Sequence, residues 1–530
     1  MNAASLLPLP VALPLVAAGL ALALARRPRL QRTVTVAALS VVLLVDVAIL
    51  AAADRSGPVV AHVGGWVAPI GISLVADRLS ALMLLVSAVV ILCVLLYSLA
   101  QGVADGDEGA PLAIYHPTYL VLVAGVSNAF LSGDLFNIYV GFEMLLAASF
   151  VLLTLGGTGE RIRAGTIYVV VSLLSSILFL VAIALVYAAT GTVNLALLAE
   201  RLPEIDPSMQ LTLQGVLLVA FLIKAAVFPL SAWLPDSYPT APAPVTAVFA
   251  GLLTKVGVYA MIRARTLLFP EGGLDDLLMV AALATMLVGI LGAVAQNDIK
   301  RMLSFTLVSH IGFMVFGLSL ASGAGLSAAI FYVAHHITVQ TTLFLVVGLI
   351  ERRGRSTSLD RLGSLVRSAP LLAVLFFVPA MNLAGIPPLS GFLGKVGLMQ
   401  AGVADGRPLA YVLVAGSLAT SLLTLYAIVK VWNRAFWREG AEPRPALATP
   451  RGMVASASAL VVAGVAITAV GGPLYRYTDL AAETLRAREP YVNAVLGEPG
   501  SRSPGRSAAG PAEEEAPTVV QAGADDGGQS

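Results

Sequence analysis

Long apolar segments separated by short polar ones run through almost the whole 530-residue chain. Each approaches the roughly 20 residues that an α-helix needs to cross the hydrocarbon core of a bilayer. The pattern therefore predicts an all-α polytopic membrane protein with about 14 transmembrane helices. We expect these helices near residues 5–25, 33–53, 79–100, 117–133, 135–155, 164–188, 212–234, 243–265, 276–296, 302–320, 326–350, 370–400, 408–433 and 452–471.

The composition agrees with this pattern and excludes several classes of protein. Hydrophobic residues make up 58% of the chain and charged residues 12%, with a mean hydropathy of +0.88, which excludes a soluble globular domain. The single cysteine, Cys93, excludes disulfides within the chain and cysteine-ligated clusters. We find no nucleotide-binding loop or nucleophile triad, and we expect no cofactor, no metal site and no nucleic-acid partner.

Basic residues are distributed unequally between alternate loops. One set of loops carries 17 arginines and lysines, whereas the opposite set carries six, among them Arg263. Because cytoplasmic loops are enriched in basic residues, the arginine-rich set should face the cytoplasm. An even number of spans then places both termini outside a cell membrane. Arginines follow the first apolar run instead of preceding it, so we expect a retained first helix and not a cleaved signal.

A lysine interrupts the apolar stretch TLQGVLLVAFLIKAAVFPLSAWLP, where Lys224 precedes Pro229 by five residues. A charged group at mid-membrane depth persists only with a partner or a use. The proline removes a backbone hydrogen bond and frees a carbonyl beside the ammonium group, an arrangement typical of broken helices at ion sites. The alternative is a lysine near a helix end that extends to the headgroups.

Lysine is rare in this chain, with five among 32 basic residues, and three of the five lie in apolar segments. Lysine can lose its proton when buried but arginine cannot, so a proton relay favours lysine. Lys255 and Lys395 are therefore candidates beside Lys224. For Lys255 a structural bond to the carbonyls of a neighbouring broken helix stays open, and for Lys395 a helix-end position.

Four further polar residues lie within predicted spans. Glu143 lies about eight residues into the fifth helix and needs a cation nearby, for which Lys224 is the natural candidate; a position at the membrane interface is the alternative. His335 and His336 lie midway along the eleventh helix, and histidine can pass protons at physiological pH. We expect at most one of the two to face the path. His310 is equally consistent with a polar link and with helix–helix packing.

A short repeat joins two of these segments. The sequence PLSAWL at residues 229–234 matches PLSGFL at residues 388–393, in the seventh and twelfth predicted helices. An offset of five helices reverses the direction of the second copy, which predicts inverted five-helix repeats with broken helices 7 and 12. We divide the chain accordingly into 1–110, helices 1–3; 111–265, a first half-channel; 266–437, a second half-channel; 438–497, the final helix and its flank; and 498–530, a disordered tail.

Four stretches resemble the antiporter-like proton-channel family that respiratory complex I shares with Mrp-type antiporters. They are SGDLFNIYVGFE, FLIKAAVFPLSAWLPDSYPTAPAPVTAVFAGLLTKVGVYA, NDIKRMLSFTLVSHIGFM and AGIPPLSGFLGK. The sequence GDLFN, the GLLTK segment and the length resemble the D-type subunits of the multisubunit Na+/H+ antiporters. The resemblance implies that Glu143 and Lys224 match the acid–lysine pair of the family, Lys255 its central lysine and Lys395 its exit-side residue.

The function that this resemblance implies is proton translocation coupled to Na+ or another monovalent cation, in a complex with other subunits and in contact with membrane lipid. Glu143, Lys224, Lys255, His335, His336 and Lys395 form the expected relay. The alternative is a pumping subunit of a quinone reductase or membrane-bound hydrogenase, in which the same residues would serve. Members of the family often carry a lysine four residues after the histidine, where this chain has Gln340.

Overall fold

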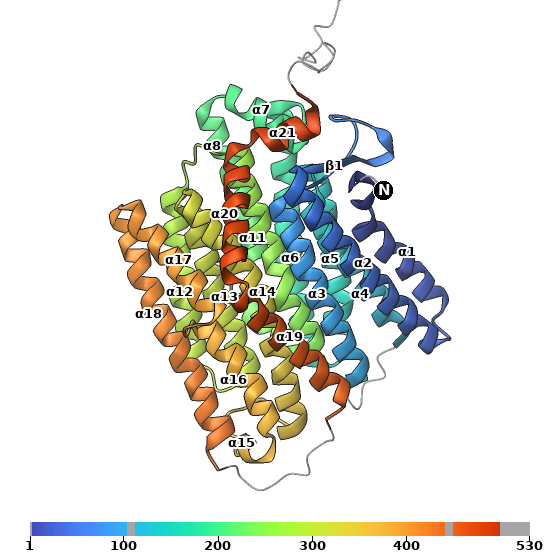
Figure 1. Cartoon of the computed structure of the whole chain (residues 1–530), viewed down its shortest axis with the longest axis vertical. Helices are drawn as coiled ribbons and strands as arrows, with labels where there is room; N and C mark the ends of the chain where they lie inside the picture. Colours follow the sequence, from blue (N-terminus) through green and yellow to red (C-terminus); the bar gives the residue numbers. More distant parts are fainter. Residues whose placement is uncertain (1–2, 103–111, 440–448, 499–530) are drawn as a thin grey trace, which may run out of the picture.

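The computed structural model describes residues 3–102, 112–439 and 449–498, and the predicted tail after Glu498 lies outside these ranges. Most of the described chain forms an upright bundle of helices (Figure 1). In these ranges 13 helices are long and apolar enough to cross a membrane. The remaining predicted span, near 370–400, is filled by the shorter apolar helix α16 (Pro370–Ala384) and by α17 (Ser390–Asp405).

The helices follow the predicted segments in order. In the first part of the chain they are α1 (Leu9–Ala23, preceded by the short η1, Ala3–Leu6), α2 (Pro28–Ser56), α3 (Arg78–Gln101), α4 (Leu112–Leu131), α5 (Leu135–Thr154), α6 (Gly159–Thr190) and α8 (Pro207–Ala225). In the second part they are α10 (Ala243–Val248) continued by η5 (Phe249–Leu253), α11 (Thr254–Arg263) and η6 (Ala264–Leu268), then α12 (Asp275–Ala295), α13 (Ile299–Ser319), α14 (Gly323–Gly354), α18 (Pro408–Val431) and α19 (Arg451–Ala469).

Two membrane-spanning segments occupy the centre of the bundle. The segment Ala243–Leu268 and the helix α14 are buried throughout their most apolar stretch. In α6, by contrast, less than half of the corresponding stretch is buried. A helix that is apolar all round is stable where other helices surround it. α14 accordingly packs against α3, α13, α16, α17, α19 and α20 (Gly471–Ala487). Lys255, His335 and His336 lie on these two central segments.

Both predicted helix breaks occur. α8 ends at Ala225, where Ala226 adopts a left-handed conformation with φ of 57° and closes the helix before the chain reaches Pro229. α16 ends at Ala384, where Gly385 has φ of 87°, a conformation that favours glycine. The helix resumes only at Ser390. Each break exposes carbonyl groups of a last helical turn inside the bundle.

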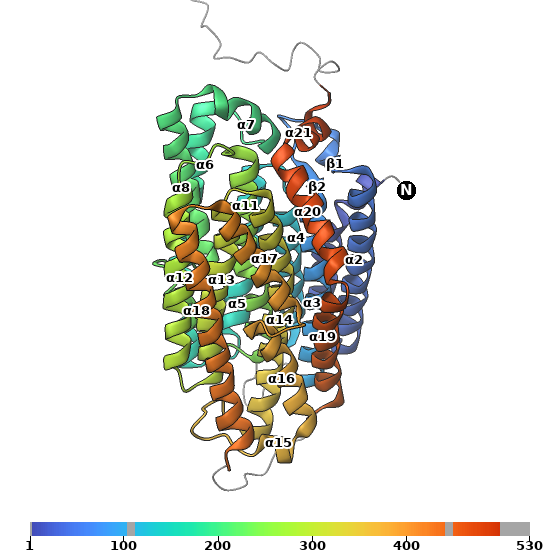
Figure 2. The ribbon, with the colours of Figure 1, turned by 60° about the vertical axis from the view of Figure 1, so that its left-hand side comes forward.

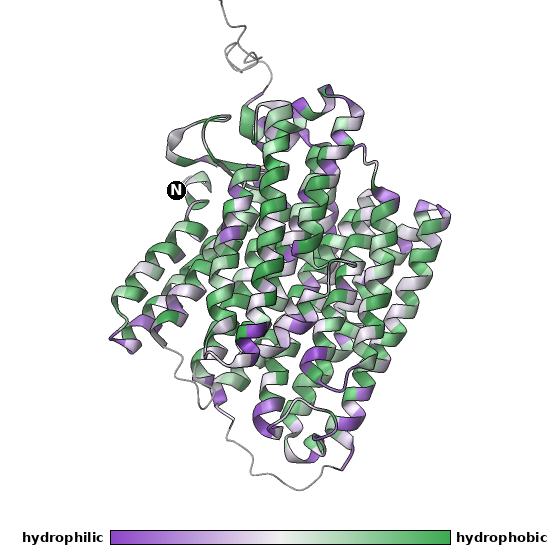
Figure 3. Cartoon of the chain, turned by 180° about the vertical axis from the view of Figure 1, so that it is seen from behind, coloured by the Kyte–Doolittle hydropathy of each residue, from purple (hydrophilic) through white to green (hydrophobic). Residues whose placement is uncertain are grey.

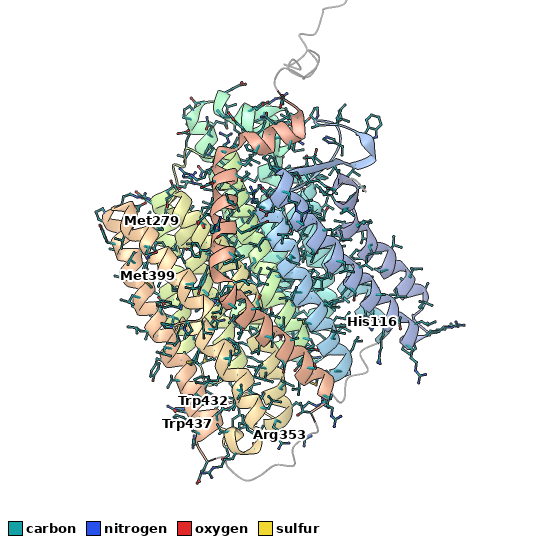
Figure 4. The ribbon with its side chains drawn as sticks, in the orientation of Figure 1. His116, Met279, Arg353, Met399, Trp432 and Trp437 are labelled. Atoms are coloured by element: carbon teal, nitrogen blue, oxygen red, sulfur yellow. The ribbon has the colours of Figure 1, made fainter. Side chains whose placement is uncertain are left out.

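The two ends of the bundle differ. One end carries α7 (Leu195–Arg201), α21 (Glu489–Leu496) and the antiparallel hairpin of β1 (Val59–His62) and β2 (Ser73–Ala76); we call it the α7/α21 face. The opposite end carries α15 (Leu365–Ser368), and Figure 2 shows the same separation after a rotation. Apolar residues predominate along the helices between the two ends (Figure 3). Trp432, Trp437 and Arg353 lie toward the α15 end (Figure 4).

The structure corrects one expectation from the sequence and adds detail to another. The loop count places Arg263 in a loop, but this arginine ends α11, where it forms an ion pair and only 2% of its surface is exposed. Residues 471–496, expected as the flank of the last span, form α20 and α21. Hydropathy misses α20 because this helix also carries charged residues, among them Asp479 and Glu483.

Candidate functional site

Lys224 lies at the inner end of a broken helix. It is the penultimate residue of α8, and its positive charge suits the negative end of the helix dipole. Its Nζ donates to Ser176 Oγ at 3.0 Å and lies 5.3 Å from the centre of the Phe142 ring. Serine and an aromatic face stabilise an ammonium group without fixing it in an ion pair. Lys224 is therefore held by a hydroxyl group and an aromatic face and not by an ion pair.

A small cavity adjoins Lys224. Its volume is about 30 Å³, enough for one or two water molecules. Polar groups on its wall come from Lys224, Ser172, Ser175 and Tyr168, and most of the remaining wall is apolar. Leu253, two residues before Lys255, completes the wall on the side of the central segment. The cavity thus joins α6 and α8 to the segment that carries the second lysine.

Glu143, for which the sequence predicts a nearby cation, acts on Lys224 without forming a contact ion pair with it. Among the residues that the structure describes, no carboxylate oxygen lies within 4 Å of Lys224 Nζ. Glu143 nevertheless acts on Lys224 electrostatically, and its Oε1 is buried with no protein hydrogen-bond partner in the described ranges. Phe142 and Ser176 take the places nearest to the ammonium group. Glu143 therefore biases the charge on Lys224 from outside contact distance.

Lys255 is fully buried in the central segment. Its Nζ donates to the carbonyl oxygen of Ala250, which belongs to the π-helical turn η5. A π-helical turn departs from the regular hydrogen-bond ladder and is frequent at functional sites. The same turn lies directly against α14, because a Cβ on Gly251 would come within 2.2 Å of Thr341 Oγ1. Lys255 is thus anchored on the side of the central histidine helix.

Three histidines continue the polar row from Lys255. His336 and His310 face each other with ring centres 5.2 Å apart, and His310 Nδ1 is 2.7 Å from the hydroxyl of Tyr332. His335 Nδ1 is 3.0 Å from Ser390 Oγ, at the start of α17. Both members of the histidine pair therefore contact polar or titratable neighbours. Neither ring nitrogen of His336 has a hydrogen-bond partner among the described protein residues.

Lys395 ends the row at the second helix break. Its side chain is buried, and Nζ donates to the carbonyl oxygens of Leu383 and Ala384, at 3.1 and 3.0 Å. These carbonyls belong to the last turn of α16 and have no partner within the helix. The Phe313 ring centre lies 5.1 Å from Nζ. The burial argues against the alternative that Lys395 extends to the headgroups.

The charges in this row act on one another. His336 interacts electrostatically with Lys255 on one side and with His310, His335 and Lys395 on the other. Between Lys224 and Lys255 the link is made by packing, because a Cβ on Gly257 would come within 2.8 Å of the Ala225 backbone nitrogen. The structure therefore brings Lys255, both histidines and Lys395 together, and places Lys224 on the neighbouring helix.

Three residues that contact the row, His310, Tyr332 and Ser390, are not part of the relay that the sequence predicts. For His310 the sequence leaves packing and a polar link equally open, and Tyr332 carries no sequence signal of its own. Ser390 lies in the repeated PLSGFL sequence, and that repeat is a signal that could have identified it. Ser390 also exchanges hydrogen bonds with Asn382, so the break of the twelfth helix supplies side-chain groups as well as carbonyls.

The fold and the row define a polytopic membrane protein with a buried chain of titratable groups between two broken helices. Residues 132–424 match the family described as NADH:quinone oxidoreductase/Mrp antiporter, TM. The D subunit of the Na(+)/H(+) antiporter of Alkalihalophilus pseudofirmus is 38% identical over 92% of this chain and 99% of that protein. The chain belongs to this family of complex I and Mrp antiporter membrane subunits.

The fold is shared with chains of solved membrane complexes. A chain of the Mrp complex from Dietzia sp. DQ12-45-1b superimposes with a TM-score of 0.87, at 34% identity, over 94% of this chain and all of that one. A chain of the membrane-bound sulfane sulfur reductase, an archaeal respiratory membrane complex, superimposes with a TM-score of 0.84, at 27% identity, over 92% and 99% of the two chains. The family therefore includes relatives in both antiporters and respiratory complexes.

Proposed function

We propose that this chain is the proton-translocating subunit of a multisubunit Na+/H+ antiporter, a secondary transporter subunit and not an enzyme. The observation that carries the proposal is the buried row from Lys255 through His336, His310 and His335 to Lys395. Ionisable residues at this depth are costly and are retained for a function. The relative at 38% identity is named as an antiporter subunit, which supports the same assignment.

Each residue of the row has a proposed role. Glu143 sets the charge on Lys224 without contacting it. Lys224 and Lys255 take up and pass on protons, since a buried ammonium group can release a proton whereas a guanidinium cannot. The histidines connect the two halves, 111–265 and 266–437, and Lys395 opens the path to one side of the membrane.

The proposed setting is a cell membrane, in contact with lipid and with other subunits of a hetero-oligomeric complex. The solved relative belongs to an Mrp complex, and the matched chain of that complex corresponds to almost the whole of this one. We propose that both termini lie outside the cell, with the α7/α21 face extracytoplasmic. The N-terminus and α21 lie toward that end in Figure 1, and Arg352, Arg353 and Arg355 end the central helix at the other.

A pumping subunit of a redox-driven complex is the second candidate. The likeness to the sulfane sulfur reductase chain favours it, because that complex is respiratory and shares the fold. The same lysines and histidines would serve in it. The two candidates differ in what drives the protons, which is a property of the partner chains. A gradient of Na+ or another monovalent cation drives proton movement only in the first.

Replacing Lys224 by alanine tests the proposal. In everted vesicles that contain the whole complex, addition of Na+ should collapse the pH gradient reported by a pH-sensitive dye. The Lys224→Ala variant should assemble, as seen on a native gel, yet give little or no dye recovery. Lys430→Ala is the matched control, because Lys430, like Lys224, lies in the last turn of a helix in an apolar segment, but it donates to two backbone carbonyls outside the row. Normal recovery in Lys224→Ala would contradict the role of this lysine.

A further inference from the structure

A second polar group lies on the same helix as Lys255, toward the α7/α21 face. Lys255, Tyr259 and Arg263 are spaced four residues apart on α11, so their side chains share one face of the helix. At 1.5 Å of rise per residue, Arg263 lies about 12 Å beyond Lys255 along the axis. Tyr259 and Arg263 therefore lie between the central lysine, Lys255, and that face of the membrane.

Arg263 is held there by a buried ion pair. Its Nη1 and Nη2 donate to the two carboxylate oxygens of Asp77 at 2.6 and 3.0 Å, and only 3% of the Asp77 surface is exposed. Arg263 Nη2 also lies 3.0 Å from Ser80 Oγ and from the Tyr259 hydroxyl. The hydroxyl of Tyr259 donates to the carbonyl of Phe130 at 2.7 Å. α3, α4 and α11 are thereby tied together at one point.

The C-terminal helix covers this group from outside. Tyr491 of α21 places its ring centre 5.2 Å from the Arg263 guanidinium carbon, and the side chain is buried. Its hydroxyl has no hydrogen-bond partner among the described residues. Tyr491 is therefore held by its ring and not by its hydroxyl. We call Asp77, Ser80, Tyr259, Arg263 and Tyr491 the α11 seal.

We infer that the α11 seal insulates Lys255 from the α7/α21 face, so that protons in the first half pass across to α14 and not directly out of the membrane. Arg263 keeps its positive charge under all physiological conditions and repels a proton that approaches along this line. The ion pair and the hydrogen bonds join Arg263 to Asp77, Ser80 and Tyr259. Lys255 itself reaches back along its helix to Ala250, away from the seal and toward α14.

The inference rests on the proposed function and extends it, because it states why proton flow stays coupled to cation movement. A direct opening beside Lys255 would let protons cross without passing His336 or Lys395. Three parts of the seal close that route: the fixed charge of Arg263, the carboxylate of Asp77, which offsets most of the free energy of burying that charge, and the ring of Tyr491 over the guanidinium group. Loss of the seal should produce an uncoupled proton leak and leave the row itself intact.

The double variant Asp77→Asn, Arg263→Gln removes the charges and keeps hydrogen-bonding groups of similar size. In proteoliposomes that contain the whole complex and no Na+, an imposed pH gradient should decay several-fold faster than in the wild type. The matched control is Asp275→Asn, Arg265→Gln, a bidentate ion pair whose arginine lies two residues beyond Arg263 but outside the cluster. The control should hold the gradient. Wild-type decay in the seal variant, or an equal leak in both, would overturn the inference.

Tyr491 provides a test that leaves the ion pair in place. Tyr491→Ala should leak and Tyr491→Phe should not, because the ring and not the hydroxyl covers Arg263. If the double variant fails to assemble on a native gel, the comparison of Tyr491→Ala with Tyr491→Phe tests the inference instead. Equal rates of decay of the pH gradient in these two variants would contradict the seal. Exchange of Na+ for protons by the wild type is measured in the same vesicles. Its absence would refute the proposed function, whereas exchange without any variant leak would refute only the seal.

Discussion

Lys395→Arg separates a proton-transfer role from a structural one at the second helix break. Lys395 Nζ donates to the carbonyls of Leu383 and Ala384, at the end of α16. Arginine keeps a positive charge and several donors at that helix end but does not release a proton. A structural cation should survive the change, and a group that must cycle between protonation states should not. Lys395→Met, which lacks both charge and donors, provides the comparison.

The magnitudes follow from the contacts. A hydrogen bond from a charged group contributes about 1.5–3 kcal/mol, so Lys395→Met, which loses two, should lower the free energy of unfolding by about 3–6 kcal/mol. Lys395→Arg keeps the charge but fits a larger head beside Gly385, at a cost of about 1–3 kcal/mol. Loss of a proton-transferring group typically slows a reaction by on the order of 10²-fold or more. We therefore expect transport to slow by this factor in both Lys395→Arg and Lys395→Met.

The assay combines thermal unfolding of the purified complex with initial rates of Na+-driven proton movement in vesicles. Lys430→Arg is the control, because Lys430 donates in the same way to Val294 and Gln296 at the end of α12. It should keep both stability and transport. Wild-type transport by Lys395→Arg would refute the relay role of Lys395 and make it a helix-capping residue.

Two further substitutions test the flanks of the row. Glu143→Gln should impair transport and Glu143→Asp should impair it less, since the carboxylate acts on Lys224 by charge without contact; equal initial rates of dye recovery would indicate packing instead. Gln340→Lys should insert and stay active, because a lysine can donate to the Leu303 carbonyl that Gln340 Nε2 now contacts at 2.9 Å, and the other amide atom has no protein partner in the described ranges. Loss of assembly on a native gel would show that the site excludes a charge.

The sequence predicts the helices and singles out the lysines within apolar segments because both signals are local. A run of about 20 apolar residues identifies a span without knowledge of its neighbours, and Pro229 and Pro388 mark the two broken segments by the backbone preference of proline. Lys255 and Lys395 stand out since a charge in such a run is rare. All of these features can be read within a single segment.

What the sequence misses depends on contacts between segments. His310 joins the row only because α13 packs against α14 and brings its ring to His336. Arg263 resembles a loop residue until its burial against Asp77, 186 positions away, is visible. That Phe142 and Ser176 lie against the Lys224 ammonium group, with Glu143 outside contact distance, is likewise not visible in the sequence. Periodicity and composition contain no such information.

His336→Leu tests the central claim most directly, namely that protons cross between the two halves through the buried row. His336 is fully buried and neither ring nitrogen has a described protein partner, so removing them sacrifices no protein hydrogen bond. Leucine is close in volume, and replacing unsatisfied polar atoms by apolar ones can be neutral. We therefore predict a complex that assembles and unfolds at the wild-type temperature but does not exchange Na+ for protons. Wild-type exchange in this variant would contradict the account.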